Sequence, residues 1–379
     1  MVDVDNCTRC GLAPVDGGAC PSGVTGGAPR RLLIGLGSGH LHGTVAVIAQ
    51  QFGLCVQALA PSLLQLSGGN LPAAISALRA AMSEVEAADI RVLLDEGTAS
   101  PEQVLALAMS APTLDQLGAQ LQAADLQAML ATEASSFRSV YQPIVTLPDR
   151  RLVAFEALLR ARDPGGVDHL PGPLFAQAHR AGWGPRLDRI GRTSALTGAA
   201  GWLGDRLLFV NFVPTSIYDP RVCLTTTERA AARAGIELSS VVFEVTESER
   251  ITEPAHLERV FDYYRERGAR VALDDLGSGW SSLNLLARLQ PDVVKLDREL
   301  VEGLSGASAR AVIRAVVDIT HSYGGQVLAE GVENERQSSS VQALGVDLAQ
   351  GWLYGRPSPP PVADGVIRRR RPMAGARRG

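Results

Sequence analysis

The chain has 379 residues, of which 46% are hydrophobic and 20% are charged, and its formal net charge is -4 at pH 7. These values are ordinary for a globular protein with one large domain and a smaller part. They exclude a broad basic surface that would recruit nucleic acid, and no apolar run reaches the ~18 residues that a membrane-spanning helix needs.

Residues 1–29 form a segment rich in glycine, proline and cysteine. The acidic start, Met1–Asp5, lacks the basic and then apolar order of a signal peptide, and five cysteines are an odd number for a disulfide framework. We therefore expect a reducing cytoplasm around the protein. Cys7, Cys10 and Cys20 are candidates for a structural zinc site, but a second CxxC is missing, so unligated cysteines remain the alternative.

Residues 30–130 are rich in alanine and leucine, and we expect a mostly helical region whose role, regulatory or other, stays open. Asn70 is a candidate cap with Pro72 in the first turn of a helix. Its expected apolar face consists of Leu71, Ile75, Leu78, Met82 and Val85. Two further helix starts match the capping box, at Ser100–Gln103 and Thr113–Gln116. The second continues as an apolar stripe through Leu114, Leu117 and Leu121, which is typical of a buried helix face.

From residue 139 onward, short apolar or β-branched runs alternate with helical stretches. The eight runs are Ser139–Val145, Leu152–Leu158, Leu207–Phe212, Val241–Val245, Arg270–Asp275, Asp292–Leu296, Gln326–Glu330 and Gly345–Ala349. Alternation of this kind predicts a mainly parallel sheet, and eight units in roughly 220 residues favour a closed barrel. We predict an α/β fold, a TIM-like (β/α)8 barrel, over residues 131–362. The Arg-rich residues 363–379 are expected to form a solvated tail.

Polar residues fall in or just after seven of these strands. They are Glu156, Asn211, Glu244, Asp274, Asp275, Lys295, Glu330 and Gln350. Because strand ends meet at one rim of such a barrel, these side chains should face each other there. Carboxylates gathered at one rim repel each other unless cations lie between them. Oxygen ligands without clustered histidine or cysteine favour Mg²⁺ or Mn²⁺, and adjacent aspartates could serve two ions.

Lys295 is the only lysine among 36 basic residues. It lies in the apolar run Asp292–Asp297, which reads as a buried strand. Lysine carries a compact point charge, whereas arginine is a wide planar fork. A single lysine in an otherwise arginine-only chain therefore indicates a function that arginine cannot perform; a lysine kept by accident is the alternative.

The order of these motifs resembles the EAL domain family of cyclic di-GMP phosphodiesterases. The matching segments are Tyr141–Val145, Glu156–Arg160, Asn211–Pro214, Glu244–Glu247, Asp274–Gly279, Lys295–Asp297, Ala329–Glu333 and Gln350–Gly351. The match runs over about residues 126–360, more than half of the chain. The resemblance implies a barrel whose first strand is antiparallel to the others and a homodimer formed through the barrel.

The resemblance also implies roles for individual residues. Two Mg²⁺ or Mn²⁺ ions would be held by Glu156, Asn211, Glu244, Asp274, Asp275 and Glu330. Lys295, Glu330, Glu333 and Gln350 would act in catalysis, and Gln142, Leu158 and Arg160 would contact the nucleotide. Glu247 would anchor the loop Leu276–Ser282, which links metal binding to dimer contacts.

Two functions follow from this reading. The first is hydrolysis of cyclic di-GMP to linear pGpG by a two-metal mechanism, which lowers the second messenger in signalling. The alternative is a catalytically weak EAL domain that serves as a cyclic di-GMP receptor or a protein-interaction module. The complete set of acids with Lys295 favours the enzyme.

Overall fold

A computed structural model describes residues 31–36, 41–67, 70–95, 111–246, 254–276 and 282–360. Several predicted features lie outside the described residues: Cys7, Cys10, Cys20, the capping box Ser100–Gln103, the loop anchor Glu247, most of the loop Leu276–Ser282, and the tail 363–379. For Asp275, only the backbone is described. The chain divides into two compact units, Met1–Phe137 with Arg160–Ile190 and Arg138–Leu159 with Gly191–Gly379.

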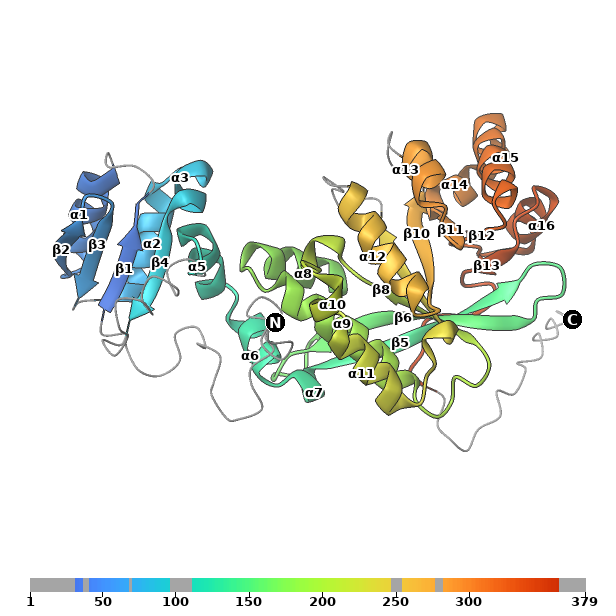
Figure 1. Ribbon diagram of the computed structural model, residues 1–379, viewed down its shortest axis with the longest axis horizontal. Helices are drawn as coiled ribbons and strands as arrows, with labels where there is room; N and C mark the ends of the chain where they lie inside the picture. The colour runs from blue at the N-terminus through green and yellow to red at the C-terminus, as the bar shows by residue number, and fades with distance from the viewer. Residues whose placement is uncertain are drawn as a thin grey trace, which may run out of the picture. The chain divides into compact units, whose positions relative to one another are not determined.

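The first unit begins with a four-stranded antiparallel sheet in the order β2-β3-β1-β4 (Figure 1). Its elements are β1 (Arg31–Gly35), α1 (Leu41–Gln51), β2 (Cys55–Ala60), β3 (Leu63–Ser67), α2 (Leu71–Ala81), α3 (Glu84–Asp89) and β4 (Arg91–Asp95). The sheet is a feature that the sequence analysis did not predict for this region. Its strands are five or six residues long, and β2 is mostly exposed, so no apolar alternation marks it.

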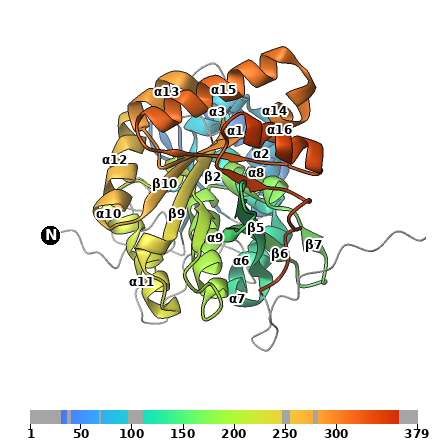
Figure 2. The ribbon, with the colours of Figure 1, turned by 90° about the vertical axis from the view of Figure 1, so that its right-hand side faces the viewer.

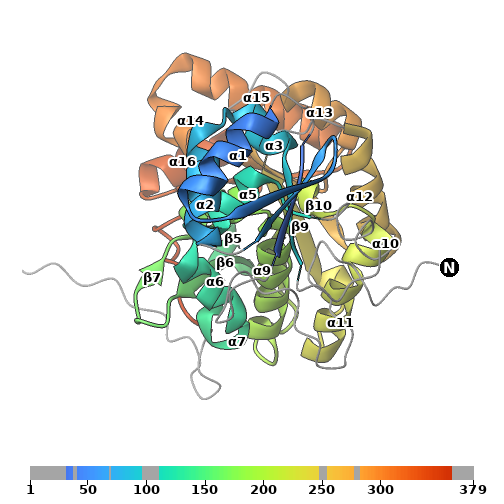
Figure 3. The same cartoon turned by 90° about the vertical axis from the view of Figure 1, so that its left-hand side faces the viewer.

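One face of this sheet carries the core of the region. Side chains two residues apart on a strand point to the same face, and Leu32 and Ile34 of β1 pair in register with Leu66 and Leu64 of β3. Helices α1 and α2 pack on that face (Figure 3). The buried face of α2 consists of Leu71, Ala74, Ile75 and Leu78.

The predicted start of α2 is confirmed, but its predicted end is wrong. Asn70 caps the helix by accepting a hydrogen bond from the Ala73 amide at 3.1 Å. The helix ends at Ala81, and Ser83 caps a new helix, α3. Val85 therefore leaves the apolar face and is 80% exposed.

From residue 111 to the start of the barrel, the described residues form the helices α5 (Leu114–Leu121), α6 (Ala124–Ala131) and α7 (Glu133–Ser136). The capping box predicted at Thr113 and Gln116 is present, and Leu114 and Leu117 are buried. The first unit also contains β7 (Asp168–His169), α8 (Pro171–Arg180) and the start of α9 (Gly184–Ala199). The Gln120 side chain donates a 2.7 Å hydrogen bond to the Ala181 carbonyl after α8.

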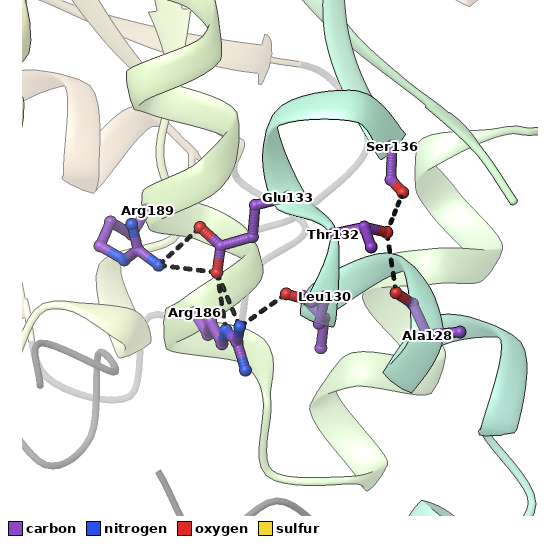
Figure 4. Close-up of polar contacts among 7 residues, drawn as sticks. All are labelled: Ala128, Leu130, Thr132, Glu133, Ser136, Arg186 and Arg189. Atoms are coloured by element: carbon purple, nitrogen blue, oxygen red, sulfur yellow. Dashed lines mark hydrogen bonds and ion pairs between the residues drawn. The ribbon is translucent and has the colours of Figure 1, made fainter. Parts of the chain in front are cut away.

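Helix α7 is tied to α9 by a small ionic cluster, which we call the Glu133 clamp (Figure 4). The carboxylate of Glu133 accepts a hydrogen bond from Arg186 Nε at 2.9 Å and contacts Arg189 Nη2 at 3.1 and 3.2 Å. Arg186 Nη2 also donates to the Leu130 carbonyl at 2.6 Å, which satisfies an end of α6. The clamp therefore fixes the helices that lead directly into the next strand.

The second unit is a closed eight-stranded barrel (Figures 1 and 2). The strands are β5 (Phe137–Thr146), β6 (Leu152–Arg162), β8 (Leu207–Asn211), β9 (Val241–Thr246), β10 (Arg270–Leu276), β11 (Val293–Leu296), β12 (Gln326–Ala329) and β13 (Leu348–Gln350). Neighbours from β6 through β13 are parallel, β13 pairs antiparallel with β5, and pairing of β5 with β6 closes the ring. The predicted barrel and its antiparallel first strand are confirmed.

Helices that follow the strands form the outer layer of the barrel (Figure 2). They are α10 (Pro220–Cys223), α11 (Thr225–Ala234), α12 (Pro254–Glu266), α13 (Ser282–Leu289), α14 (Arg298–Glu302), α15 (Ala307–Ser322) and α16 (Glu335–Ala343). Their amphipathic faces bury residues such as Leu257 and Val260 of α12 and Ile313 of α15. Across the described residues, every helix falls short of the length and apolarity that crossing a bilayer requires.

The barrel interior contains an apolar layer to which each of the eight strands contributes one residue. In barrel order this layer consists of Ile144, Ala154, Phe209, Val242, Ala272, Val293, Leu328 and Leu348. All eight side chains are buried, so the interior is packed rather than open at this level. The layer forms the floor on which the next ring of side chains stands.

Candidate functional site

The candidate site is the ring of side chains directly above the apolar layer. A step of two residues along a strand keeps the same face, so each interior apolar residue is followed two positions later by another interior residue. On the seven parallel strands these are Glu156, Asn211, Glu244, Asp274, Lys295, Glu330 and Gln350. On the antiparallel β5 the corresponding step runs backward, from Ile144 to Gln142. All eight positions are polar, so the ring is a polar layer at the carboxyl end of the parallel strands.

Lys295 lies at the centre of the polar layer. Its Nζ is 2.7 Å from Glu330 Oε1 and 3.0 Å from both Glu244 Oε2 and Asp274 Oδ2. Glu156 Oε1 lies further away, at 3.7 Å. The Lys295 side chain is fully buried. We call this group of one ammonium and four carboxylates the Lys295 cluster.

Two amides complete the polar layer. Asn211 Nδ2 donates to Glu244 Oε1 at 2.6 Å and reaches Glu156 Oε1 at 3.4 Å. Gln350 Nε2 donates to Glu156 Oε2 and, at 3.0 Å, to Gln142 Oε1. These bonds join β5, β6, β8, β9 and β13 into one network and fix the orientation of the Glu156 carboxylate.

The Lys295 cluster contains more acidic than basic groups, and its burial shifts their pKa values. Burial, opposed by Lys295 but reinforced by Glu156 and Asp274, raises the pKa of Glu244 well above its ordinary value. Burial likewise raises the pKa of Glu330 to about 8. Burial alone would lower the pKa of Lys295, but the surrounding carboxylates raise it well above its usual range. Lys295 is therefore a permanent cation that neutralises only part of the acidic charge.

The donor set fits divalent cations by its chemistry. The carboxylates converge on the ammonium, and among the described residues no three or more His, Cys, Asp or Glu side chains are arranged around one metal position. Both oxygens of Glu244 already have partners, Lys295 Nζ and Asn211 Nδ2, whereas buried Gln350 Oε1 accepts no hydrogen bond. If fully ionised, four carboxylates and one ammonium leave three negative charges, which hard cations with oxygen ligands would offset. Asn211 adds a neutral amide oxygen to this set.

A cavity of about 290 Å³ opens above the polar layer. Its lining consists of Gln142, Glu156, Leu158, Asp274, Arg298, Glu330, Gly331, Glu333, Gln350, Gly351 and Trp352. The structure thus brings most of the predicted site residues together. Arg160 lies two residues beyond Leu158 on β6 and is outside this lining, although it shares the strand face of Glu156 and Leu158.

Two lining residues, Arg298 and Trp352, were missed by the sequence analysis. Arg298 Nη2 donates to Glu333 Oε1 at 2.9 Å and so connects Glu333 to the cavity wall. A signal was available for both, because Arg298 follows the Lys295–Asp297 motif and Trp352 follows Gln350–Gly351. Position next to a strand-end motif places a residue at the same rim.

Comparison with known proteins identifies the family. The family model described as "EAL domain" matches residues 123–357, which is more than half of the chain. The chain belongs to the EAL domain family. The matched residues include the entire barrel and every residue of the polar layer.

Relatives of this EAL domain include proteins named for cyclic di-GMP. Cyclic di-GMP phosphodiesterase PA2567 of Pseudomonas aeruginosa is 31% identical over 265 residues, covering 68% of this chain and 45% of that protein. An uncharacterized relative from Azorhizobium caulinodans is 30% identical over 247 residues, covering 63% of this chain and 34% of that protein. The chain therefore spans less than half the length of either relative.

Solved EAL structures are similar as well. The PaMucR phosphodiesterase in complex with c-di-GMP is 28% identical with a TM-score of 0.56, covering 62% of this chain and 97% of that chain. BlrP1 of Klebsiella pneumoniae, in a manganese/cy-diGMP complex, is 25% identical with a TM-score of 0.53. That match covers 87% of this chain and 96% of BlrP1, so it extends beyond the EAL domain into the residues before it.

Proposed function

We propose that this EAL domain is a metal-dependent phosphodiesterase specific for cyclic di-GMP, which it hydrolyses to linear pGpG. The observation that carries the proposal is the polar layer, in which every barrel strand places a polar side chain above a sealed apolar floor. The name of PA2567 and the c-di-GMP complex of PaMucR support the choice of substrate. The reaction would lower the second messenger in the cytoplasm, the proposed location.

We propose that Glu156, Asn211, Glu244, Asp274, Asp275 and Glu330 hold two Mg²⁺ or Mn²⁺ ions. Such ions, when bound, supply a Lewis acid for the phosphate and lower the pKa of a water molecule. The excess of carboxylates over ammonium groups around Lys295 supports this assignment. BlrP1, a similar protein, was solved with manganese and cyclic di-GMP.

The remaining residues would act on the substrate itself. Lys295 Nζ, buried and positively charged, would offset negative charge that develops on the phosphate oxygens. Gln350, fixed by its bonds to Glu156 and Gln142, would orient the phosphate or the attacking water. Glu333 is positioned beside the cavity by Arg298 and would complete the catalytic set.

The nucleotide contacts in this proposal come from two strands. Gln142 of β5 and Leu158 of β6 line the cavity, and Arg160 lies on the same strand as Leu158. Leu158 supplies an apolar contact, whereas the Arg160 guanidinium would pair with a phosphate of the substrate.

We further propose that the active form is a homodimer in which Glu247 anchors the loop Leu276–Ser282 and relays the dimer contact to the metal site. The support is resemblance to the family. Analytical ultracentrifugation at the concentrations used for activity provides the test, and full activity of a monomer would contradict the proposal.

An activity assay tests the proposed hydrolysis of cyclic di-GMP. Purified protein is incubated with cyclic di-GMP and Mg²⁺ or Mn²⁺, and the nucleotides are separated by chromatography. We expect pGpG with either ion, no turnover in EDTA, and inhibition by Ca²⁺. Binding of cyclic di-GMP without any turnover would favour the alternative, a receptor or interaction module. Undiminished turnover in EDTA would rule out metal-assisted hydrolysis.

A further inference from the structure

The first unit contains a long stretch without charge. From Leu32 to Leu78 the sequence has no Asp, Glu, Lys or Arg, although 20% of the whole chain is charged. Part of this stretch is core, but β2 is not, because five of its six residues are exposed. Among them, Leu59 is 46% exposed. Surface strands usually carry charged side chains that prevent association, so a neutral and partly apolar one indicates a surface that is covered in an assembly.

β2 also forms one edge of its sheet (Figure 1). In the described part of the chain it pairs only with β3, in a register that runs from Cys55↔Ser67 to Ala58↔Leu64. The backbone groups on its other side therefore lack a strand partner among these residues. Edge strands are commonly protected by lysine, proline or a bulge. β2 contains neither lysine nor proline, and its register shift lies after Ala58, so Cys55–Ala58 remains a regular edge.

The opposite edge of the sheet, β4, is already covered. Arg91 of β4 forms a bridge with Thr113, and the Val92 amide donates a hydrogen bond to the Pro112 carbonyl at 3.0 Å. The described sheet thus has one covered edge and one open edge. This difference decides which assembly the sheet can form, since an endless row of sheets needs two open edges whereas a closed pair needs only one.

We propose that β2 is a docking surface for a second copy of this chain, whose β2 pairs with it antiparallel about a two-fold axis. The pair forms one continuous eight-stranded sheet, with main-chain hydrogen bonds between the two central strands. A partner recognised through charge finds no charged side chain on this strand, whereas an identical strand brings no charge to repel. The contact lies in the first unit, and it requires nothing of the barrel contact in the proposed homodimer.

Gln57 is the residue that reports on this contact. Val56 packs against the core on the helix-covered face, so Gln57, one residue later, points to the other face of the sheet, where it is exposed. About a two-fold axis perpendicular to the sheet, side chains on the same face oppose each other. In a register centred on the middle of β2, Gln57 and the partner's Gln57 therefore have Cβ atoms about 5 Å apart if directly opposite and about 7–8 Å apart if diagonal.

The experiment introduces one charge at this position in the full chain. Amide hydrogen exchange is measured for the peptide Leu54–Ala60 at the highest soluble concentration, and association is measured by sedimentation velocity. We expect Gln57→Lys and Gln57→Glu each to speed exchange of the β2 amides by about tenfold or more, because like charges then meet across the axis. An equimolar mixture of the two variants should restore exchange to within about threefold of wild type, since opposite charges then meet.

Val85→Lys is the matched control. It adds the same charge at an apolar residue of the first unit that is 80% exposed and lies on α3, outside the sheet. Its exchange at Leu54–Ala60 should equal that of wild type. Circular dichroism should be unchanged in all variants, because Gln57 and Val85 are exposed. A variant that unfolds exchanges fast both alone and in the mixture, so recovery in the mixture separates lost pairing from lost folding.

Three results would overturn the inference: wild type that sediments as a monomer at every concentration, equal exchange at Leu54–Ala60 in wild type and both charged variants, or fast exchange that the mixture does not correct. Each would leave the proposed hydrolysis untouched, because β2 carries no residue of the site. Conversely, charge-dependent pairing in a protein without phosphodiesterase activity would leave the docking surface standing and remove only the proposed function.

Discussion

The Lys295 cluster and the Glu133 clamp use the same kinds of side chain with opposite balance. In the clamp, one carboxylate meets two guanidinium groups at a site about a third exposed. In the Lys295 cluster, four carboxylates meet one ammonium in a buried site. The clamp leaves one positive charge, which water can screen because its side chains are 15% to 32% exposed. The excess carboxylates of the cluster are buried, and buried groups with unbalanced charge are typical of functional sites.

The largest expected effect comes from removing an acid of the cluster. Glu156→Ala and Asp274→Ala should each abolish turnover and Mn²⁺ binding, because each removes a proposed ligand from a set with no spare donor. Their side chains stand above the apolar floor, so circular dichroism should show a folded barrel. Near-normal activity in either variant would mean that the ligand assignment is wrong.

A second expected effect tests whether the cluster needs lysine itself. Lys295→Arg keeps the charge but places a wider, planar group among carboxylates 2.7 to 3.7 Å away. Misplacement of about 1 Å can cost on the order of 100-fold in rate, so we expect at least that loss in kcat, with cyclic di-GMP binding retained.

The matched control is the reverse exchange in the clamp. Arg186→Lys should change the free energy of unfolding by about 1 kcal/mol or less and leave kcat unchanged, since partly exposed pairs contribute little. Equal kcat for Lys295→Arg and wild type would remove the functional argument for the single lysine.

A third, smaller effect concerns pH. Glu330 has a pKa raised to about 8, so it is protonated in the metal-free protein at neutral pH and must release that proton to bind a cation. The affinity for Mn²⁺ should therefore rise with pH, by up to about tenfold per unit, and level off above about pH 8. Calorimetry in two buffers with different heats of ionisation measures the proton released. An affinity that stays flat from about pH 6 to 8 would contradict this.

The smallest effect is expected at the clamp. Glu133→Gln removes the charge that Arg186 and Arg189 share, but both guanidinium groups keep access to water. We expect a loss of about 1 kcal/mol or less in the free energy of unfolding, measured by urea denaturation, and no change in metal binding. A loss of Mn²⁺ affinity in this variant would show that the two ionic groups are not independent.

The barrel could be predicted because its strands have a recognisable pattern in the sequence. Each is a short apolar run, and seven of the eight have a polar residue in or just after them, as in Val293-Val294-Lys295; eight runs in this order leave few other folds. The sheet of the first unit could not be predicted, because a strand such as β2 has neither apolar alternation nor a buried face. Its existence depends on pairing with β3, which is a tertiary contact.

The site was predictable as a set of residues but not as an arrangement. The sequence places acids at strand ends, yet it does not indicate that Lys295 lies between four of them, since that depends on barrel closure and side-chain depth. The places of Arg298 and Trp352 in the cavity wall could be inferred from the strand-end motifs that they follow. Their contacts could not, because these depend on distant residues such as Glu333.

The closure of the barrel through β5 and β13 has a consequence for how the protein is made. Gln142 and Gln350 share a hydrogen bond across 208 residues of chain, and Gln350 reaches Glu156 across 194. Contacts of such long sequence separation form late and slow the folding of a domain. During synthesis, the strand that carries Glu156 therefore emerges from the ribosome long before its hydrogen-bond donor Gln350, and the cavity exists only after β13 has been translated.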